Sequence, residues 1–344
     1  MYKRQLIYLM FTPAFLAFLF TTFPRFSATP PIEKIVYMTI VIPFAIGSLL
    51  LTIGSLTLSS IATMGIIVTL IGHLLSINIL RKIYRNSVVK DKHDMFWILI
   101  SMAMGGVSDI LFTIGYLFES GFIINFAIQI AIYLYLLMVT FSVAQRMVPF
   151  FSNATGEKDL NLIKVIATLL GLHVILETIV PHLSFIVDFL LVYIIGNELL
   201  NWELPFPNKN PLLWILHLAL FWIPTAFLFS GVSNLIAIFS GANFLFLDIH
   251  ILVLGFILTM LIGFGTRVTL GHSENRLIAD EWTKILFYWT QVVVISRIVT
   301  SLIFAFHWNF LFWFDMTITV WIVLFAIWAF KFFGVLIFGK KLDN

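Results

Sequence analysis

Ionisable side chains that could bind a metal or carry protons lie inside long apolar runs of this chain. Charged or titratable residues at membrane depth are costly, so a functional role is the first hypothesis for each of them. Imidazole is a common metal ligand, and carboxylates and guanidinium groups pair with one another or with bound cofactors. The residues concerned are Asp109, His173, Glu177, Asp188, His217, His250, Arg297 and Asp315, with His272 at the end of one run.

The first candidate pair is His173 and Glu177, which are four residues apart and therefore share one face of a helix. A carboxylate in this position could orient the imidazole of a metal ligand. The alternative is a hydrogen-bonded structural pair, because two residues alone make no metal site.

His250 opens a run in which Gly255, Thr259 and Gly263 recur every four residues, a spacing that permits close packing of helices. As a candidate ligand, His250 competes with a simpler interpretation, which is an interfacial histidine beside Asp248.

The most deeply apolar surroundings belong to His217, in "LWILHLALFW", and to Arg297, in "QVVVISRIVTSL". Taken alone, a histidine in such surroundings is more often a satisfied core residue than a ligand. Arg297 needs a counter-charge at membrane depth. The candidates are a haem propionate, Asp109, Asp188 and Asp315.

The stretch "GTRVTLGHSENRL", residues 265–277, places His272 between Arg267 and Arg276. The two arginines are ordinary cationic residues at the cytoplasmic end of a span. His272 follows a glycine at a turn, and its ordinary pKa near 6.5 leaves it largely neutral and able to coordinate a metal.

The composition shows which elements must position these groups. Of the 344 residues, 61% are hydrophobic and 11% are charged, whereas soluble domains carry roughly 25% charged residues. The apolar runs are continuous rather than alternating, which predicts helices that span a bilayer. We therefore expect an all-α, polytopic helix bundle that forms one integral membrane domain over residues 1–344. The eleven predicted spans are 6–23, 35–54, 58–80, 95–117, 122–144, 161–180, 183–202, 211–230, 246–266, 283–305 and 310–336, and the stretch 231–245 is expected to lie in the interface or to re-enter the membrane.

The basic residues predict the orientation. All of the 20 Lys and Arg residues except Lys3, Arg4 and Arg297 fall in one set of alternate loops or at the span ends beside them. Cytoplasmic loops carry this excess, so the C-terminus is expected in the cytoplasm of a bacterial inner membrane. The same pattern explains the basic charge without a nucleic-acid partner. It also places His217 and His272 toward the inner face, and the carboxylates, His173 and His250 in the outer half.

The absence of one residue type limits the possible cofactors, and the first five residues raise a separate question about the N-terminus. The chain has no cysteine, which excludes cysteine-ligated clusters, thiolate-ligated haem and covalent haem attachment. Residues 1–5, "MYKRQ", would be encoded by GTG-TAT-AAG-AGA-CAG if GTG is read as a start codon, and this string ends a transposon mosaic sequence used to prepare sequencing libraries. We expect these five residues to be an adapter artefact. The intact chain would then have twelve spans.

Four stretches, taken together, resemble the NnrS family in order and spacing. They are "FLFTTFPRF" (18–26), "AQRMVPFFS" (144–152), "LWILHLALFW" (213–222) and "DIHILVLGFILTMLIGFGTRVTLGH" (248–272). NnrS proteins are described as bacterial inner-membrane proteins with about twelve spans, which contain haem and copper and are linked to nitric oxide and nitrosative stress.

The resemblance implies candidate cofactor-binding residues. His217, His250 and His272 match histidines of the family and are the implied metal ligands, and Arg146 matches the arginine of its Arg-x-x-Pro-Phe-Phe stretch. Arg297 is the further cofactor-binding candidate, and His173, Glu177 and Asp109 are secondary ones. The implied cofactors are non-covalent haem and copper. The implied partners are the lipid bilayer and nitric oxide or nitrosylated metal species, with the electron donor left open.

This chain departs from the family pattern at two places. After His272 it reads Ser273-Glu274-Asn275-Arg276 where the family has Thr-Gly-Arg. A His-x-His-Glu stretch of the family falls on Tyr2, Arg4 and Gln5, inside the expected adapter remnant. If that loss is native, the outer metal cluster lacks ligands.

The resulting hypothesis is a haem- and copper-binding membrane protein of nitric oxide resistance, which binds or relieves nitric oxide or nitrosylated metal. Whether it is an enzyme stays open. The alternative is a secondary transporter that uses intramembrane Asp, Glu and Arg as an ion or proton path. A helical bundle can serve either function.

Overall fold

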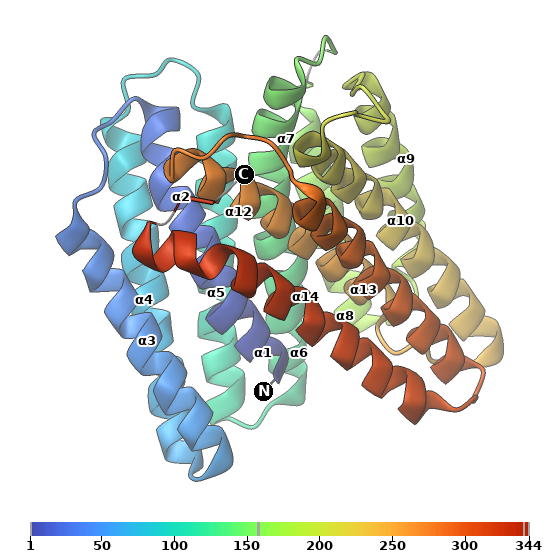
Figure 1. The fold of residues 1–344 in the computed structure, drawn as a ribbon. Helices are drawn as coiled ribbons and strands as arrows, with labels where there is room; N and C mark the ends of the chain where they lie inside the picture. Colours follow the sequence, from blue (N-terminus) through green and yellow to red (C-terminus); the bar gives the residue numbers. More distant parts are fainter. Residues whose placement is uncertain (1, 157–158, 340, 343–344) are drawn as a thin grey trace. The chain divides into compact units, whose positions relative to one another are not determined.

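The computed structural model describes residues 2–156, 159–339 and 341–342 of the chain (Figure 1). Within these residues the structure is helical and contains no strand. Ten of the helices described are long and apolar enough to cross a membrane. The prediction of an all-α, multi-pass membrane protein is therefore confirmed.

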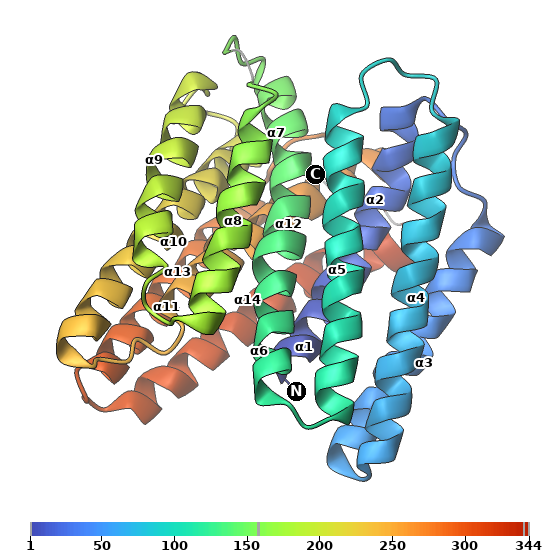
Figure 2. The same cartoon turned by 180° about the vertical axis from the view of Figure 1, so that it is seen from behind.

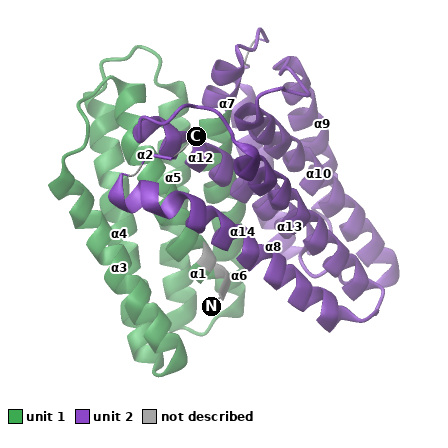
Figure 3. Cartoon of the chain, in the orientation of Figure 1, with its two compact units in different colours: residues 1–144 green, residues 145–344 purple. Residues whose placement is uncertain are grey.

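The chain forms two compact units, residues 1–144 and 145–344, each made of such helices (Figure 3). Helix α7 (Met138–Ser152) runs through the boundary between them. Unit 1 contains α1 (Tyr2–Gln5), η1 (Leu6–Phe11), α2 (Thr12–Ser27), α3 (Lys34–Leu56), α4 (Ser59–Asn86), α5 (His93–Leu117), α6 (Gly121–Gln129) and η2 (Ile130–Leu137). Unit 2 contains α8 (Leu162–Ile179), α9 (Phe185–Asn201), α10 (Pro211–Ser240), α11 (Leu247–His250), η3 (Ile251–Leu258), α12 (Thr259–His272), α13 (Glu281–Ala305) and α14 (Phe310–Phe338).

Three segments, η1, η2 and η3, are π-helical turns built into longer helices. At the ends of η1 and η3, Thr12 and Thr259 each donate a side-chain hydrogen bond to a carbonyl five residues earlier. Such turns widen a helix and occur frequently at functional sites. They carry Tyr8 and Tyr135 in unit 1, and η3 begins directly after His250 in unit 2.

The predicted spans correspond to helices, with one correction at residues 231–245. The prediction that the span ends at residue 230 is wrong, because residues 231–240 continue α10 as one helix of 30 residues. An interfacial position of residues 231–245 stays a prediction. The polar residues that suggested a break are satisfied within the bundle: Asn234 is hydrogen-bonded to Ser184 and His182. Gly231 lets α10 approach α9, since a Cβ there would lie 2.9 Å from the Phe189 ring.

The predicted span 183–202 corresponds to helix α9, which has 17 residues or about 25 Å of helix and is not among the ten long helices. It packs against both α8 and α10 (Figure 2). The chain reverses direction between α8 and α9 and again between α9 and α10. The end of α8, the start of α9 and the end of α10 therefore lie at the same end of unit 2.

Candidate functional site

His217 is the best-supported candidate ligand, because it is fully buried in unit 2 at 0% exposure. Helix α10 carries it two turns after its start, where Asn210 caps the helix by accepting a hydrogen bond from the Leu212 N–H. Its Nε2 atom lies 2.6 Å from Oγ of Ser152, the last residue of α7. Its Nδ1 atom has no hydrogen-bond partner among the residues described, although the Pro205 backbone is near the ring.

A cation and two aromatic rings lie beside this contact. The Arg267 guanidinium of α12 lies over the Phe151 ring, with 4.1 Å between its central carbon and the ring centroid. The Phe151 ring also meets Phe264 of α12 at 6.4 Å. An arginine over an aromatic face gains a cation–π attraction, which is stronger where water is excluded.

Residues far apart in the sequence therefore meet at one place in unit 2. Ser152 and Phe151 end the stretch 144–152, His217 belongs to 213–222, and Phe264 and Arg267 belong to 248–272. Chemically, this arrangement presents a buried imidazole that has one ring nitrogen held by a hydroxyl. A hydrogen bond of this kind fixes the orientation of a ligating histidine. The other nitrogen remains available to a donor or a metal.

The residues of this site lie within the part of the chain that a protein-family model matches. A family model described as NnrS protein matches residues 1–338. The chain belongs to the NnrS family. A comparison with curated proteins finds no match. The family match covers the three stretches that converge on His217 as well as 18–26 in unit 1.

The three histidines implied by the NnrS resemblance do not form one site. His250 and His272 lie at opposite ends of a continuous helix of 26 residues, roughly 33 Å apart at 1.5 Å per residue. His272 is exposed at the end of α12. Among the residues that the structure describes, no three His, Cys, Asp or Glu side chains are grouped to hold a metal ion. These histidines therefore do not fit a shared copper centre.

His250 and Arg297 instead meet on one loop in front of α11. His250 Nδ1 lies 2.6 Å from the Phe246 carbonyl oxygen, and an Arg297 Nη atom donates to the Leu245 carbonyl at 3.1 Å. Leu245 and Phe246 both have positive φ angles, 49° and 56°, which cost energy for residues with a side chain. Both side chains therefore hold a strained turn in place.

Arg297 also donates to Ser301 at 3.1 Å, and no carboxylate among the described residues forms an ion pair with it. Of the predicted alternatives, Asp109 pairs with Arg4, Asp188 contacts His173, and Asp315 is exposed. Within the described residues, carbonyl and hydroxyl oxygens thus take the place of the expected carboxylates, and the haem propionate stays a prediction.

Asp109 lies in unit 1 and is fully buried, with its Oδ1 atom 2.7 Å from Arg4 Nη2. Arg4, which belongs to the stretch expected to be an adapter remnant, also donates to Thr69 at 2.9 Å. His73 is buried next to this pair, between the rings of Tyr8 and Tyr135. Both His73 ring nitrogens lack a hydrogen-bond partner among the described residues. No local pattern in the sequence points to His73, because the rings beside it come from other segments of the chain.

The secondary candidates of unit 2 belong to one network. His173 Nδ1 lies 2.7 Å from Asp188 Oδ1 of α9, and Glu177 accepts a hydrogen bond from Ser184. The predicted i,i+4 relationship places both on α8, but Asp188 supplies the close carboxylate. Arg146, the remaining candidate, is half-buried on α7, less than two turns before Ser152.

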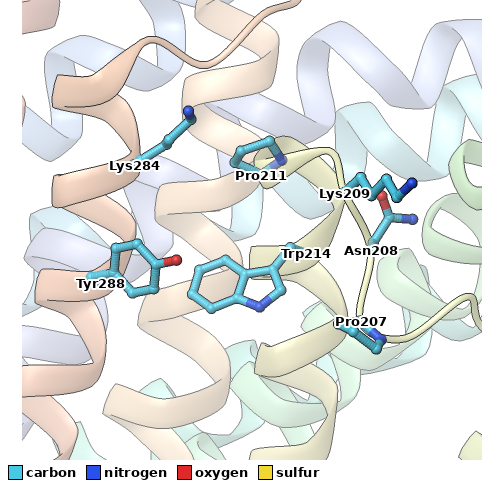
Figure 4. A pocket seen from close by; sticks show the side chains of 7 residues that line it. All are labelled: Pro207, Asn208, Lys209, Pro211, Trp214, Lys284 and Tyr288. Carbon is cyan, nitrogen blue, oxygen red and sulfur yellow. The ribbon is translucent and has the colours of Figure 1, made fainter.

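A surface cavity of about 360 Å³ lies at the first turns of α10 and α13 (Figure 4). The rings of Trp214 and Tyr288 meet there at 5.0 Å between centroids. The ammonium groups of Lys209 and Lys284 lie on opposite sides of the cavity in the figure. It contains none of the predicted cofactor-binding residues, and aromatic rings with lysines are typical of a membrane–water boundary.

Proposed function

We propose that this protein acts in resistance to nitric oxide and nitrosative stress, as a haem-binding protein of the bacterial inner membrane with a cytoplasmic C-terminus. The observation that supports the proposal most directly is the convergence of three NnrS-like stretches on His217. A single buried imidazole with a nitrogen that has no partner among the described residues is a group that would hold haem iron. When bound, ligated haem iron supplies a site for a small uncharged gas.

The residues around His217 have distinct roles in this proposal. Ser152 holds Nε2 at 2.6 Å and so determines the direction of the ring plane. Phe151 and Phe264 exclude water, which strengthens electrostatic interactions inside the site. Arg267, which is partly buried over Phe151, and Arg146, which is partly buried on α7, would supply positive charge near an anionic cofactor edge.

Copper enters the proposal only as a family property. Because His250 and His272 cannot share an ion, the residues described do not fit a copper centre built from His217, His250 and His272. We therefore assign copper no ligands in this chain and no chemical role.

The test is an optical spectrum of the purified full-length protein in detergent, with metal analysis of the same sample. Wild type is expected to show a haem Soret band that shifts when nitric oxide is added. His217→Ala should lose the band, whereas His272→Ala, at an exposed helix end, should keep it. Ser152→Ala should retain haem but change the band position, because the ring loses its orienting contact.

Circular dichroism and elution volume must first show that each variant is folded. A Soret band that survives in folded His217→Ala contradicts the assigned ligand. A folded wild type that binds no haem contradicts the proposed function. Survival of bacteria under nitric oxide, compared between wild type and His217→Ala, then tests the physiological part.

A further inference from the structure

A network of hydrogen bonds in unit 2 leads from the protein surface to a buried imidazole. The Ser184 hydroxyl donates to Glu177 Oε2 at 2.8 Å and also lies 3.4 Å from Asp188 Oδ2. The other oxygen of Asp188 lies 2.7 Å from His173 Nδ1. A carboxylate, a hydroxyl, a second carboxylate and an imidazole therefore follow one another, and the 3.4 Å between Ser184 and Asp188 is the one contact longer than an ordinary hydrogen bond.

Burial increases along this series. Glu177 is partly exposed near the end of α8, whereas Ser184, Asp188 and His173 are all 0% exposed. His173 lies nearly two turns inside α8, with its ring edge-on to Phe227 at 5.9 Å. Glu177 is thus accessible from outside the protein, whereas His173 is reached only through protein groups.

The Ser184 hydroxyl can switch its hydrogen bond between the two carboxylates. Its oxygen accepts a hydrogen bond from Asn234 Nδ2 at 2.9 Å, which holds the oxygen in place. Its single proton can serve only one carboxylate at a time. At 2.8 Å it serves Glu177, while Asp188 at 3.4 Å is beyond an ordinary O–H···O distance. Rotation of this one hydroxyl exchanges the two partners.

Asp188 remains supported while Ser184 points away. The Ser230 hydroxyl of α10 donates to Asp188 Oδ2 at 2.8 Å, and His173 contacts the other oxygen. A charged carboxylate in an apolar interior is costly unless its lone pairs are used. Two partners that do not depend on Ser184 leave that hydroxyl free to rotate.

We propose that Glu177, Ser184 and Asp188 form a proton pathway through which the aqueous phase at this end of unit 2 sets the protonation of buried His173. A proton first binds the Glu177 carboxylate. The Glu177 O–H bond breaks as its proton passes to Ser184 Oγ, and the original Ser184 O–H bond breaks as that proton forms an O–H bond at Asp188 Oδ2. The proton shared by Asp188 Oδ1 and His173 Nδ1 then moves to Nδ1. The Asp188–His173 pair ends with one additional proton, and Ser184 ends as it began.

Negative charge surrounds the buried end of the pathway. The carboxylates of Asp188, Glu177 and Asp248 act on the His173 ring from α9, α8 and α11. His182, in the loop before α9, contacts Asn234 Oδ1 at 3.0 Å and is the titratable group nearest the surface. A positive charge on the imidazole is thus matched by carboxylates on three helices. The pathway goes beyond haem binding, since it includes neither His217 nor Ser152.

The experiment is time-resolved infrared spectroscopy of the purified protein, labelled with ¹³C-histidine, after a pH jump. The His173 band is assigned as the signal lost in His173→Gln. Wild type should respond rapidly, and Ser184→Ala should respond at least about tenfold more slowly, since positioned proton-transfer groups contribute factors of that size or larger. Ser184→Thr keeps a hydroxyl and should restore the rate.

The matched control is Ser233→Ala on α10, because the Ser233 hydroxyl bonds carbonyls of its own helix. It should respond as wild type does. If Ser184→Ala does not fold, Glu177→Gln tests the same pathway from its entrance and should slow the response. Equal rates in wild type and a folded pathway variant would overturn the proposal, as would a His173 that does not titrate while the protein is folded.

Discussion

Replacement of Gly255 by alanine should destabilise unit 2, because the methyl group has no space. An added Cβ would lie 2.6 Å from Cγ of Trp222 and 2.9 Å from its Cβ and Cδ2 atoms. The ring cannot move away freely, since the indole N–H of Trp222 donates to Gln291 at 2.8 Å. Overpacking of this kind costs about 1–3 kcal/mol. We expect that loss in the free energy of unfolding of Gly255→Ala.

Gly265 is the matched control, because it belongs to the same continuous helix but an added Cβ meets nothing within 4 Å. Gly265→Ala should be neutral or should stabilise by up to about 1 kcal/mol through helix propensity. Equilibrium unfolding in bicelles, followed by steric trapping, measures both variants. Trp222→Leu removes the ring, so the double variant with Gly255→Ala should lose less stability than the sum of the single changes. Equal stability of the two alanine variants, or strict additivity, would refute the packing argument.

Two further changes test the ends of helices. Glu119 ends α5 with a φ of 51° and is exposed, so Glu119→Gly should raise stability by about 1 kcal/mol in the same unfolding assay; a loss would show that the side chain has an unseen role. Burial raises the pKa of Asp280, but hydrogen bonds from Lys331 and Thr283 outweigh it and hold the pKa below its ordinary value. The contribution is present above that ordinary value, near 3.9, and is lost as the pH falls through the lowered pKa. Asp280→Asn should therefore lower the free energy of unfolding at neutral pH in the same assay, by less than about 1 kcal/mol because the group is half-exposed, and a difference from wild type that persists in acid would contradict this assignment.

The helices could be predicted from the sequence because each is specified by a local run of apolar residues. The length of a span and the absence of alternation follow from composition, and neither depends on what packs against it. The break expected after residue 230 was wrong because the residues that suggested it make their contacts with other segments of the chain. Gly231 and Asn234 resemble loop residues only until Phe189 and Ser184 of neighbouring segments are known. Tertiary contacts turned apparent breakers into parts of one helix.

For the site, the sequence indicated some of the residues but not the residues that contact them. His217 was indicated by the NnrS resemblance, but its partner Ser152 is 65 residues away in the sequence, and no periodicity connects them. The i,i+4 rule related His173 to Glu177, although the close carboxylate, Asp188, comes from the next helix. A rule based on spacing relates residues on one face of a single helix. Here the neighbouring helix provides the contact that determines the chemistry.

The two buried imidazoles of unit 2 are consequently suited to different tasks. His217 contacts a neutral hydroxyl and keeps one nitrogen unpartnered among the described residues, which suits coordination. His173 contacts a carboxylate and is surrounded by further negative charge, which suits a group that holds a proton. A metal ligand must be unprotonated at the coordinating nitrogen, whereas a proton acceptor must tolerate charge. In this chain the neutral partner on α7 suits His217 to the proposed coordination, and the carboxylate partner on α9 suits His173 to the proposed proton transfer.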